Sequence, residues 1–532
     1  MSPNLDRISV KARANPDLVF TSLYHHVADI DHLRTCYQLL KGNKAVGLDE
    51  VTKAMYANDL EANLQDLSAR LKRMGYRPQP KLRVYIPKPG SEKGRPLGIS
   101  SFEDKIVELA TKRVLEPLFE PLFEACSYGY RPGRSPHQCL DALGRTIQQK
   151  RVNHLVEADI RGFFDAVNHE WLLKFLRQRI GDERVLRLIS RMLKAGVMED
   201  GLSEAAEVGT PQGSILSPLL SNVYLHYVLD LWFQRRVRRQ SRGEAYLFRF
   251  ADDFLACFQY RTDAEAFHQS LGNRLEGFHL ELAQEKTKCL EFGRYARTNA
   301  YQRGEKPKEF TFLGMTFFCG KNRYGAFKVK RKTSRKKLRQ SLVRFTDWIR
   351  RYRNLLPSGE LLRRAKARIQ GHLNYYAITD NSESCQRYLH LTRRALFKWL
   401  NRRSQRKSYT WEGFLQALKH VGWPQARIRV NLNPFCNAER LNEEPDVGNL
   451  LVRFCEGVRH NWCMAEILWH RRETRRQTEN TNVMPVALEG LISTRLNSML
   501  SAPSSDVNGP TSYGFSFDPM IACVCASQSE RL

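Results

Sequence analysis

The chain of 532 residues has no hydrophobic run long enough to cross a bilayer, and its cysteines form no CxxC pair. Because a membrane helix needs about 20 consecutive apolar residues, the sequence predicts no membrane span. The N-terminus lacks the apolar core and small-residue cleavage site of a secretory signal peptide. The 12 cysteines follow no paired framework, which is typical of proteins in a reducing compartment. We therefore expect a cytoplasmic protein.

Acidic residues are scarce relative to basic ones, and the imbalance is concentrated in one segment. The chain has 85 lysines and arginines against 56 aspartates and glutamates, a formal net charge of +29. Residues 321–430 contain 29 basic and five acidic residues, whereas residues 431–532 are slightly acidic. Charge that only solubilised the surface would be spread evenly. This concentration indicates a polyanionic partner, of which nucleic acid is the commonest.

The hydrophobic pattern divides the chain into regions. Helical patterns open it and end at the glycine-rich loop 39–52, and short apolar strands alternate with amphipathic helices between about residues 82 and 313. From 321 to about 423 the pattern is almost entirely helical, with arginine and lysine on the polar faces. The pattern then weakens, and 501–514 has a composition typical of disorder. We expect an α+β fold with a helical domain after the sheet domain.

Three aspartates occur in apolar strand patterns, where a core sheet does not tolerate unpaired charge. Asp159 ends the segment HLVEAD, and Asp252 and Asp253 interrupt YLFRFADDFLACF, which predicts a hairpin with its turn on the acidic pair. Burying like charges together is costly unless a cation neutralises them, and Mg²⁺ prefers oxygen ligands. Two such ions could activate a primer 3′-hydroxyl and stabilise leaving pyrophosphate. The alternative for Asp252 and Asp253 is an ordinary solvated turn.

A series of ordered motifs favours the catalytic interpretation. DIRGFF, GTPQGSILSPLLSN, RFADDF, ELAQEKTKCL and FTFLGM occur in the order of reverse-transcriptase palm motifs. IPKPGSEKGRPLGI and YGYRPGRSPHQCL resemble the fingers motifs of that family, so that the resemblance covers about residues 39–318. It implies a right-hand polymerase fold in which Asp159, Asp252 and Asp253 bind two Mg²⁺ ions. It also implies an RNA template, a DNA primer and dNTPs as substrates.

The resemblance assigns nucleotide contacts to three residues near these acids. Phe164 matches the ring that lies beneath the incoming sugar and excludes a 2′-hydroxyl, although a core aromatic would also suit this position. Gln212 and Gly213 would lie against the nascent base pair, because glycine permits close backbone approach. The sequence departs from the family at Phe250, where a tyrosine usually precedes Ala-Asp-Asp. We expect this change to alter fidelity or primer contact without abolishing activity.

Charged residues complete the predicted nucleotide site. Lys93 and Arg95 lie in a Gly/Pro-rich loop suited to contacts with a triphosphate. Lys286 resembles the palm lysine proposed to protonate pyrophosphate. For these three residues the alternative is a solvated surface charge. Asp165 is expected to have a structural role, capping the helix that follows through His169.

The flanking regions favour the group II intron lineage of reverse transcriptases. Loop 39–52 resembles the N-terminal extension of that lineage, and IQGHLNYYAITDNS with ALFKWLNRRSQRKSYTWEGF resembles its maturase domain, domain X. We therefore expect an N-terminal extension (1–67), fingers and palm (68–318), a helical thumb and maturase domain (319–430) and a tail of unknown role (431–532). The tail is slightly acidic and the chain has no CxxC pair, so we expect no Cys/His endonuclease domain.

The basic helical domain is predicted to bind intron RNA. Its aromatic residues can serve either RNA stacking or the core of a helical bundle. The candidate RNA contacts are Arg393, Arg394, Arg402 and Arg403.

Together these features predict an RNA-directed DNA polymerase that binds its group II intron RNA, promotes splicing and mediates insertion into target DNA. One alternative is a host-adopted reverse transcriptase in phage defence or DNA repair, which would often lack an intact maturase domain. Another is an RNA-binding splicing factor with an inactive palm, against which the complete set of three aspartates argues. An RNA-dependent RNA polymerase is disfavoured by Phe164.

Overall fold

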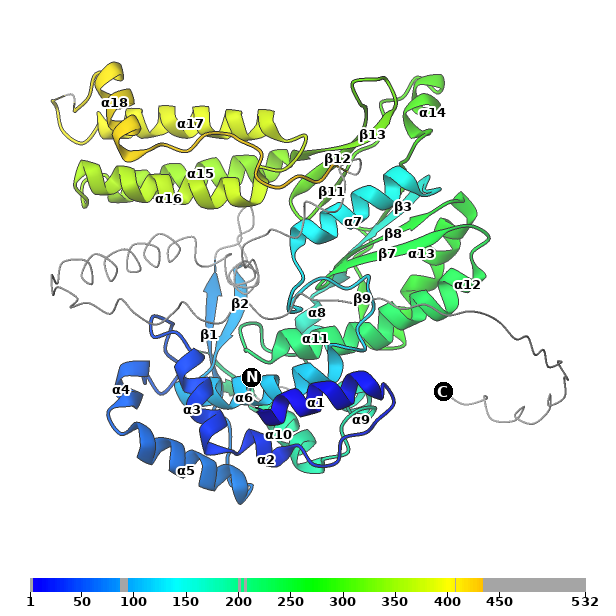
Figure 1. Cartoon of the computed structure of the whole chain (residues 1–532), viewed down its shortest axis with the longest axis vertical. Helices are drawn as coiled ribbons and strands as arrows, with labels where there is room; N and C mark the ends of the chain where they lie inside the picture. The colour runs from blue at the N-terminus through cyan, green and yellow to red at the C-terminus, as the bar shows by residue number, and fades with distance from the viewer. Residues whose placement is uncertain (1–2, 87–93, 200–201, 205–207, 407, 434–532) are drawn as a thin grey trace, which may run out of the picture. The chain divides into compact units, whose positions relative to one another are not determined.

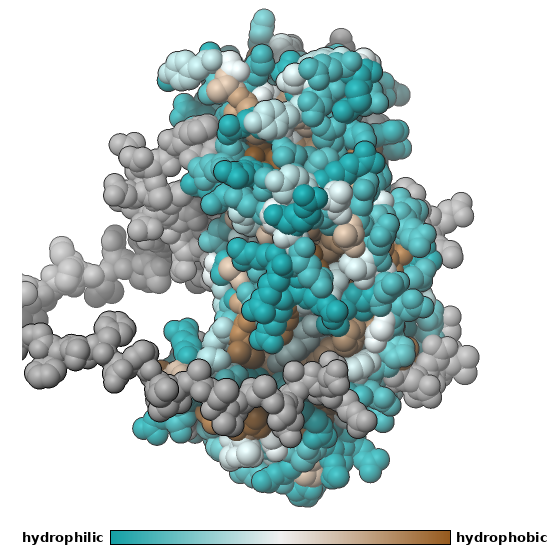
Figure 2. Space-filling model, turned by 90° about the vertical axis from the view of Figure 1, so that its right-hand side faces the viewer, coloured by the Kyte–Doolittle hydropathy of each residue, from teal (hydrophilic) through white to brown (hydrophobic). Residues whose placement is uncertain are grey.

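The computed structural model describes residues 3–86, 94–199, 202–204, 208–406 and 408–433 (Figure 1), all within one compact unit, Met1–Arg471. Among these residues no helix is long and apolar enough to cross a membrane. Hydrophilic residues cover most of the face shown in Figure 2, and hydrophobic residues appear there in smaller patches. The fold is a mixed α+β domain followed by a helical region, as the sequence predicts.

The N-terminal region is helical on both sides of the loop predicted from its glycines. Its helices are α1 (Pro3–Ala14), α2 (Tyr24–Val27), α3 (Ile30–Leu39), α4 (Lys53–Ala57) and α5 (Leu60–Lys72). Asp29 caps α3 and Thr52 caps α4, each accepting a backbone N–H with its side chain. Residues 40–52 between these helices form neither helix nor strand. Helices α1, α2 and α3 pack on α6 (Phe102–Phe119), whose buried face belongs to the main hydrophobic core, and α5 packs on α3.

A first sheet has the strand order β2-β1-β5-β6. Its strands are β1 (Lys81–Ile86), β2 (Arg95–Ile99), β5 (Val197–Glu199) and β6 (Leu202–Glu204). A buried ion pair of 2.5 Å between Lys81 on β1 and Glu108 on α6 fixes the sheet to the core. Glu108 also accepts the backbone N–H of Ile215 (2.9 Å), and therefore ties this sheet to the loop that precedes α11 (Ser217–Leu225).

The central sheet is antiparallel, with the order β10-β3-β8-β7. Its strands are β10 (Lys288–Glu291), β3 (His154–Ala158), β8 (Asp253–Phe258) and β7 (Ala245–Phe250). Successive side chains point to opposite faces of a strand, and here both faces are covered. Phe254 and Ala256 join the core that contains α13 (Arg261–Glu276), whereas Leu255 and Cys257 join a second core beneath α7 (Pro136–Gln149). Burial on both faces explains the nearly continuous apolar run in β8.

Short elements connect these layers. They are β4 (Ile160–Arg161), α8 (Phe163–Ala166), α9 (His169–Arg177), α10 (Glu183–Lys194), the π-helical turns η1 (His226–Asp230) and η2 (Phe233–Val237), α12 (Arg238–Gln240), β9 (Glu281–Leu282) and α14 (Ala296–Gln302). β4 and β9 pair with each other beside the central sheet.

A third sheet leads into the helical domain. It consists of β11 (Phe310–Phe312), β12 (Met315–Lys321) and β13 (Phe327–Thr333), joined antiparallel. The prediction of almost uninterrupted helix from residue 321 is therefore wrong for β13. Its alternation of buried and partly exposed residues is a strand pattern that the many lysines and arginines obscured. The expected domain boundary at 318/319 falls within β12, which spans Met315–Lys321. This strand pairs with β13 along its whole length, so the sheet continues across that position.

The helical domain has its own core. It comprises α15 (Arg335–Tyr352), α16 (Ser358–Tyr376), α17 (Ser382–Leu400) and α18 (Trp411–Val421). Trp348 and Leu396 are buried in this core, and Trp399 packs against it while remaining partly exposed. The bundle-core interpretation, which concerned Trp399 and Trp411, therefore holds in part for Trp399. Trp411, with 42% of its surface exposed, lies at the edge.

Candidate active site

The central sheet brings the three predicted acids together. Ala158 at the end of β3 pairs with Phe254 on β8, so Asp159 lies opposite Asp253 at the same end of two neighbouring strands. Ala251 and Asp252 form the turn between β7 and β8, and Asp253, which pairs with Phe250, is the first residue of β8. The hairpin predicted from YLFRFADDFLACF is confirmed, but its turn lies one residue earlier than expected and includes only Asp252 of the acidic pair. Three carboxylates thus converge at one edge of an apolar sheet.

Mutual repulsion and the surrounding protein make ionisation of these acids costly. Desolvation, together with the smaller effects of the neighbouring charges of Asp252, Asp159 and Glu157, raises the pKa of Asp253 to about 7. Desolvation is also the largest cause of the raised pKa of Asp252. The Asp253 side chain remains accessible to solvent, so protein packed around it, rather than complete loss of water contact, desolvates it. A bound cation would favour the ionised forms of these carboxyls.

Lys286 neutralises part of this cluster. Its ammonium group is in direct contact with Asp159, in a pair of which the lysine is 58% and the aspartate 23% exposed. The hydrogen bond to Asp159 is the largest cause of the raised pKa of Lys286. The backbone N–H of Ala283 donates to the carbonyl of Asp159 (2.9 Å), which fixes the QEKTK turn beside β3. The structure therefore places Lys286 at the acids, and not on a remote surface.

The three aspartates suit hard divalent cations, although their side chains are not preorganised around a metal ion. Within the described residues no three Asp, Glu, His or Cys side chains form a ready-made metal cluster, and Asp159 is engaged by Lys286. The donors are carboxylate oxygens with strong mutual repulsion, which is the chemistry that Mg²⁺ neutralises. Metal binding at Asp159 would require this carboxylate to exchange the ammonium group for the ion.

The first sheet contributes a positive charge to the acids. Arg95, the exposed first residue of β2, is close enough to Asp252 for its charge to lower the pKa of that carboxyl. Lys337, on the first turn of α15, acts in the same direction on Asp253. Lys337 was not among the predicted site residues, because its sequence neighbourhood is only a run of basic residues. Lys93 lies outside the described residues.

The Pro-Gln-Gly loop is clamped between the first sheet and α8. The backbone N–H of Gly98 on β2 donates to the carbonyl of Gln212 (2.7 Å), and the N–H of Thr210 donates to the carbonyl of Phe164 (2.6 Å). Gly213 has a positive φ of 116°, and a Cβ there would lie 2.6 Å from the carbonyl oxygen of Gly98. The backbone at Gly213 therefore approaches β2 closely. Contact of Gln212 and Gly213 with a base pair remains a prediction.

Phe164 lies on the short helix α8, and its backbone carbonyl accepts the N–H of Thr210 from this loop. Its ring is partly buried and meets Phe163 edge to face, with centroids 5.5 Å apart. Phe163 is the core residue of the pair, with 2% of its surface exposed. The expectation for Asp165 is wrong: α9 is capped by Asn168, whose side chain accepts the N–H of Trp171 (3.0 Å). Asp165 lies in α8, three residues too early to serve as that cap.

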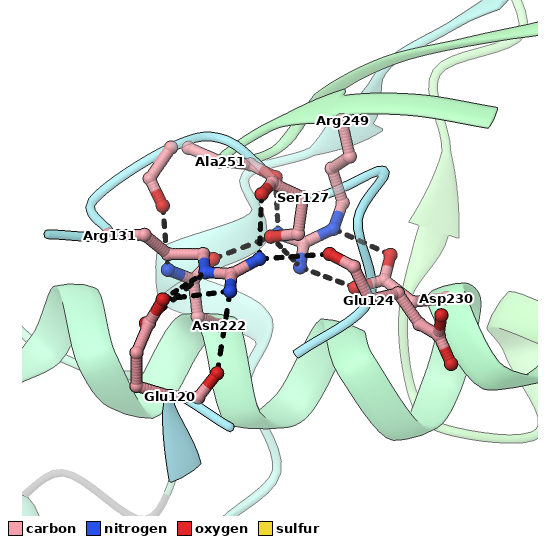
Figure 3. A network of polar contacts seen from close by, with 9 residues as sticks. Glu120, Glu124, Ser127, Arg131, Asn222, Asp230, Arg249 and Ala251 are labelled. Atoms are coloured by element: carbon pink, nitrogen blue, oxygen red, sulfur yellow. Dashed lines mark hydrogen bonds and ion pairs between the residues drawn. The ribbon is translucent and has the colours of Figure 1, made fainter. Parts of the chain in front are cut away.

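A buried network that the sequence did not predict holds the β7–β8 turn at Ala251 (Figure 3). Arg249 on β7 forms a bidentate pair with Asp230 of η1, at 2.7 and 2.6 Å, and neither side chain is exposed. Its guanidinium also donates to Asn222 Oδ1 (2.9 Å), to Ser127 Oγ (2.7 Å) and to the carbonyl of Ala251 (3.1 Å). The sequence signal that could have revealed this network was Arg249, a charged residue within an otherwise apolar strand.

The fingers-like motif YGYRPG packs on the same turn. Ala251 adopts a positive φ of 58°, and a Cβ on Gly129 would lie 2.2 Å from its backbone nitrogen. Only glycine at 129 lets the two backbones approach so closely. Asn222 completes the link by donating to the carbonyl of Gly129 (2.7 Å). The turn that carries two of the acids is therefore fixed from both sides.

The four predicted RNA-binding arginines differ in their surroundings. Arg394 and Arg402 are exposed, whereas Arg393 and Arg403 are partly buried. Arg403 donates to Ser358 Oγ (2.6 Å) and to the carbonyl of Leu356 (2.8 Å), and so holds the α15–α16 connection against the end of α17. Arg402 lies over the Trp399 ring, 5.7 Å from its centroid. The exposed residues Arg394 and Arg402 are therefore the better candidates for RNA contact.

Comparison with known proteins agrees with this arrangement. The family model described as "Reverse transcriptase (RNA-dependent DNA polymerase)" matches residues 86–317, and the model "Group II intron, maturase-specific domain" matches residues 328–416. Protein YkfC of Escherichia coli (strain K12) is 32% identical over 352 residues, which are 60% of this chain and 88% of that relative. The chain belongs to the group II intron reverse transcriptase and maturase family.

Another relative in this family is named for an intron. Group II intron-encoded protein LtrA of Lactococcus lactis subsp. cremoris is 40% identical over 231 residues, 43% of this chain and 38% of LtrA. The match thus spans little more than a third of that relative. The reverse transcriptase model includes all three aspartates, Lys286 and the Pro-Gln-Gly loop, and the maturase model begins in β13. The domain order of the family is therefore present in the described part of the chain.

Proposed function

We propose that the protein is an RNA-directed DNA polymerase that extends a DNA primer with dNTPs on an RNA template, using two Mg²⁺ ions. The observation that carries the proposal is the meeting of Asp159, Asp252 and Asp253 at one edge of the central sheet, with Lys286 and Arg95 beside them. The reverse transcriptase domain matched over residues 86–317 supports the same chemistry.

In this proposal the side chains divide the work of nucleotide addition. The bound cations would activate the primer hydroxyl and stabilise charge on the leaving pyrophosphate. Arg95 and Lys93 orient the triphosphate, and Phe164 excludes a 2′-hydroxyl from the sugar position. Gln212 and Gly213 face the new base pair. Lys286 carries a proton at Nζ beside Asp159, where pyrophosphate can receive it.

The test of the polymerase proposal is primer extension with matched templates. The purified chain should extend a DNA primer on RNA with dNTPs and Mg²⁺, and chelation of the metal should stop extension. The same primer offered with rNTPs should be extended far less efficiently. Absence of extension under all metal conditions, by a protein that still binds the primer–template, would contradict the proposal.

We further propose that the protein binds its own group II intron RNA in the cytoplasm, promotes its splicing and supports its insertion into target DNA. The separate helical core after β13, its basic faces and the maturase-specific match support this second activity. Splicing does not need the three carboxylates. A variant with Asp159, Asp252 and Asp253 changed to asparagine should therefore still accelerate splicing of the encoding intron at low Mg²⁺. If the intact protein gives no acceleration, the maturase part of the proposal is wrong.

A further inference from the structure

A hollow open to solvent lies at the tip of the β12–β13 hairpin. Its volume is about 730 Å³. The chain turns at this tip between Lys321 and Phe327, and Asp380 before α17 forms part of the opposite wall. The residues that line it and carry its chemistry are Lys321, Arg323, Tyr324, Lys328, Lys330 and Asp380. None of these residues takes part in the polymerase site.

The hollow holds more positive charge than the described part of the chain neutralises. Lys328 is paired with Asp380 at 2.8 Å. Among the residues that the structure describes, Lys321, Arg323 and Lys330 have no acidic partner within ion-pair distance. Lys321 and Arg323 are exposed, and Lys330 is partly exposed. Three cations that share a hollow repel one another, and binding of a polyanion would relieve this repulsion.

An exposed aromatic ring gives the hollow a second property. Tyr324 has 76% of its surface exposed, more than the other large hydrophobic or aromatic side chains at the described surface. The Arg323 guanidinium lies over its ring, 4.7 Å from the centroid. An exposed ring among cations is suited to a stacked base with its neighbouring phosphates. A single inorganic anion would use neither the ring nor most of the volume.

We propose that the tip of the β12–β13 hairpin is a nucleic-acid site that takes the phosphate backbone of RNA and stacks one base on Tyr324. The inference rests on the proposed function only in taking RNA as the polyanion. β12 starts next to the Leu313–Gly314 turn, where a Cβ on Gly314 would lie 3.6 Å from Lys337, the lysine whose charge acts on Asp253. Since β12 is seven residues long, the tip lies about 20 Å along the strand from that turn. RNA held there is bound apart from the reacting ends. It is either the far part of the template–primer duplex or folded RNA outside it.

The experiment compares three variants of the full chain. In the first, Lys321, Arg323 and Lys330 are replaced by glutamine; in the second, Tyr324 by alanine. The matched control replaces Arg236, Arg239 and Arg242, three exposed arginines of the region around α12, by glutamine. Thermal unfolding establishes that each variant is folded. Binding is then measured against salt concentration for two probes, a primer–template duplex and a folded RNA stem–loop without primer.

The hairpin variant should lower the salt slope of binding by up to about three ions, since each lost phosphate contact removes about one. The control should change the slope much less, and Tyr324→Ala should weaken binding without changing the slope. A fall confined to the duplex identifies the template–primer as the ligand, whereas a fall with the stem–loop identifies folded RNA. Unchanged slopes for both probes, or an equal fall in the control, would overturn the proposal. Because the experiment measures binding, its result does not depend on whether the protein synthesises DNA.

Discussion

Arg249 and Asp230 form a fully buried, bidentate ion pair, and the same guanidinium donates to the carbonyl of Ala251, the residue that precedes the two adjacent aspartates. The pair therefore connects the interior of the domain to the position of Asp252. A buried charge needs its partner, because loss of one member leaves the other unpaired in the core. The relationship implies two separable effects, one on stability and one on the geometry of the turn.

Arg249→Met should destabilise the protein by roughly 3–5 kcal/mol, because it leaves the Asp230 carboxylate buried without its cation. The double variant Arg249→Met with Asp230→Leu should recover most of that stability. It cannot restore the hydrogen bond to Ala251, so the rate of nucleotide incorporation should remain at least about tenfold low, about 1.4 kcal/mol in the barrier. Urea unfolding and single-turnover extension measure the two effects. Full recovery of rate in the double variant would reduce Arg249 to a purely structural residue.

Phe164→Ala should relax sugar discrimination, because the partly buried ring of α8 is the group proposed to meet a 2′-hydroxyl. We expect the ratio of kcat/KM for dNTP over rNTP to fall on the order of tenfold or more, with dNTP incorporation retained. The matched control is Phe163→Leu, since Phe163 is the buried neighbour. That variant should lose stability and keep its discrimination. An unchanged ratio in Phe164→Ala would assign the ring to the core.

Arg403 should behave differently from Arg394 and Arg402. Arg403→Gln removes hydrogen bonds to Ser358 and Leu356, so we expect a loss of about 1–3 kcal/mol in stability. Replacing Arg394 and Arg402 together by glutamine should leave stability almost unchanged and reduce the salt slope of RNA binding by about two ions. Thermal unfolding and titration with the intron RNA distinguish these effects. If Arg403→Gln instead lowered the salt slope of RNA binding, and the double variant instead lost stability, Arg403 would be the RNA contact.

The sequence predicted the strands that carry chemistry better than the connection between domains. β1, β3 and the β7–β8 hairpin follow from apolar runs bounded by turn residues, and the acids were visible because charge interrupts such runs. β13 was missed because its lysines and arginines resemble a basic helix when the partner strand β12 is unknown. A strand edge depends on pairing between distant segments, which local periodicity does not contain.

The site residues missed from sequence share a physical reason. Asp230, Ser127 and Asn222 meet Arg249 only after folding brings η1, α11 and the loop before Tyr128 together. Each is an ordinary polar residue in its own segment. Lys337 was hidden in the same way, among the basic residues that begin α15. Predicting such contacts requires the topology as well as the motifs.

His226 predicts a pH dependence of stability. Burial lowers its pKa to about 4 from the ordinary 6.5, and nearby arginines act in the same direction against the opposing charge of Asp230. The unfolded chain therefore protonates His226 more readily than the folded chain. The stabilising effect of the neutral form is complete above pH 6.5 and is lost as pH falls toward 4. Between pH 7.5 and 5 the loss is about 2 kcal/mol.

His226→Gln isolates this contribution, because glutamine does not titrate. The free energy of unfolding of the wild type, relative to this variant, should fall by about 2 kcal/mol between pH 7.5 and 5. Urea unfolding at both pH values gives the difference, in which the titration of other groups cancels. If the two proteins lose stability in parallel, His226 is protonated without penalty in the folded chain.

The central claim is that Asp159, Asp252 and Asp253 hold the cations that catalyse DNA synthesis. Its most direct test is single-nucleotide incorporation on an RNA template by Asp252→Asn and Asp253→Asn, with Asp165→Asn as a control that removes an exposed carboxylate from the nearby α8. We predict that both variants of the turn lose incorporation by at least about a thousandfold, about 4 kcal/mol, while still binding the primer–template, and that Asp165→Asn retains it. Incorporation at near wild-type rates by either turn variant would contradict the account.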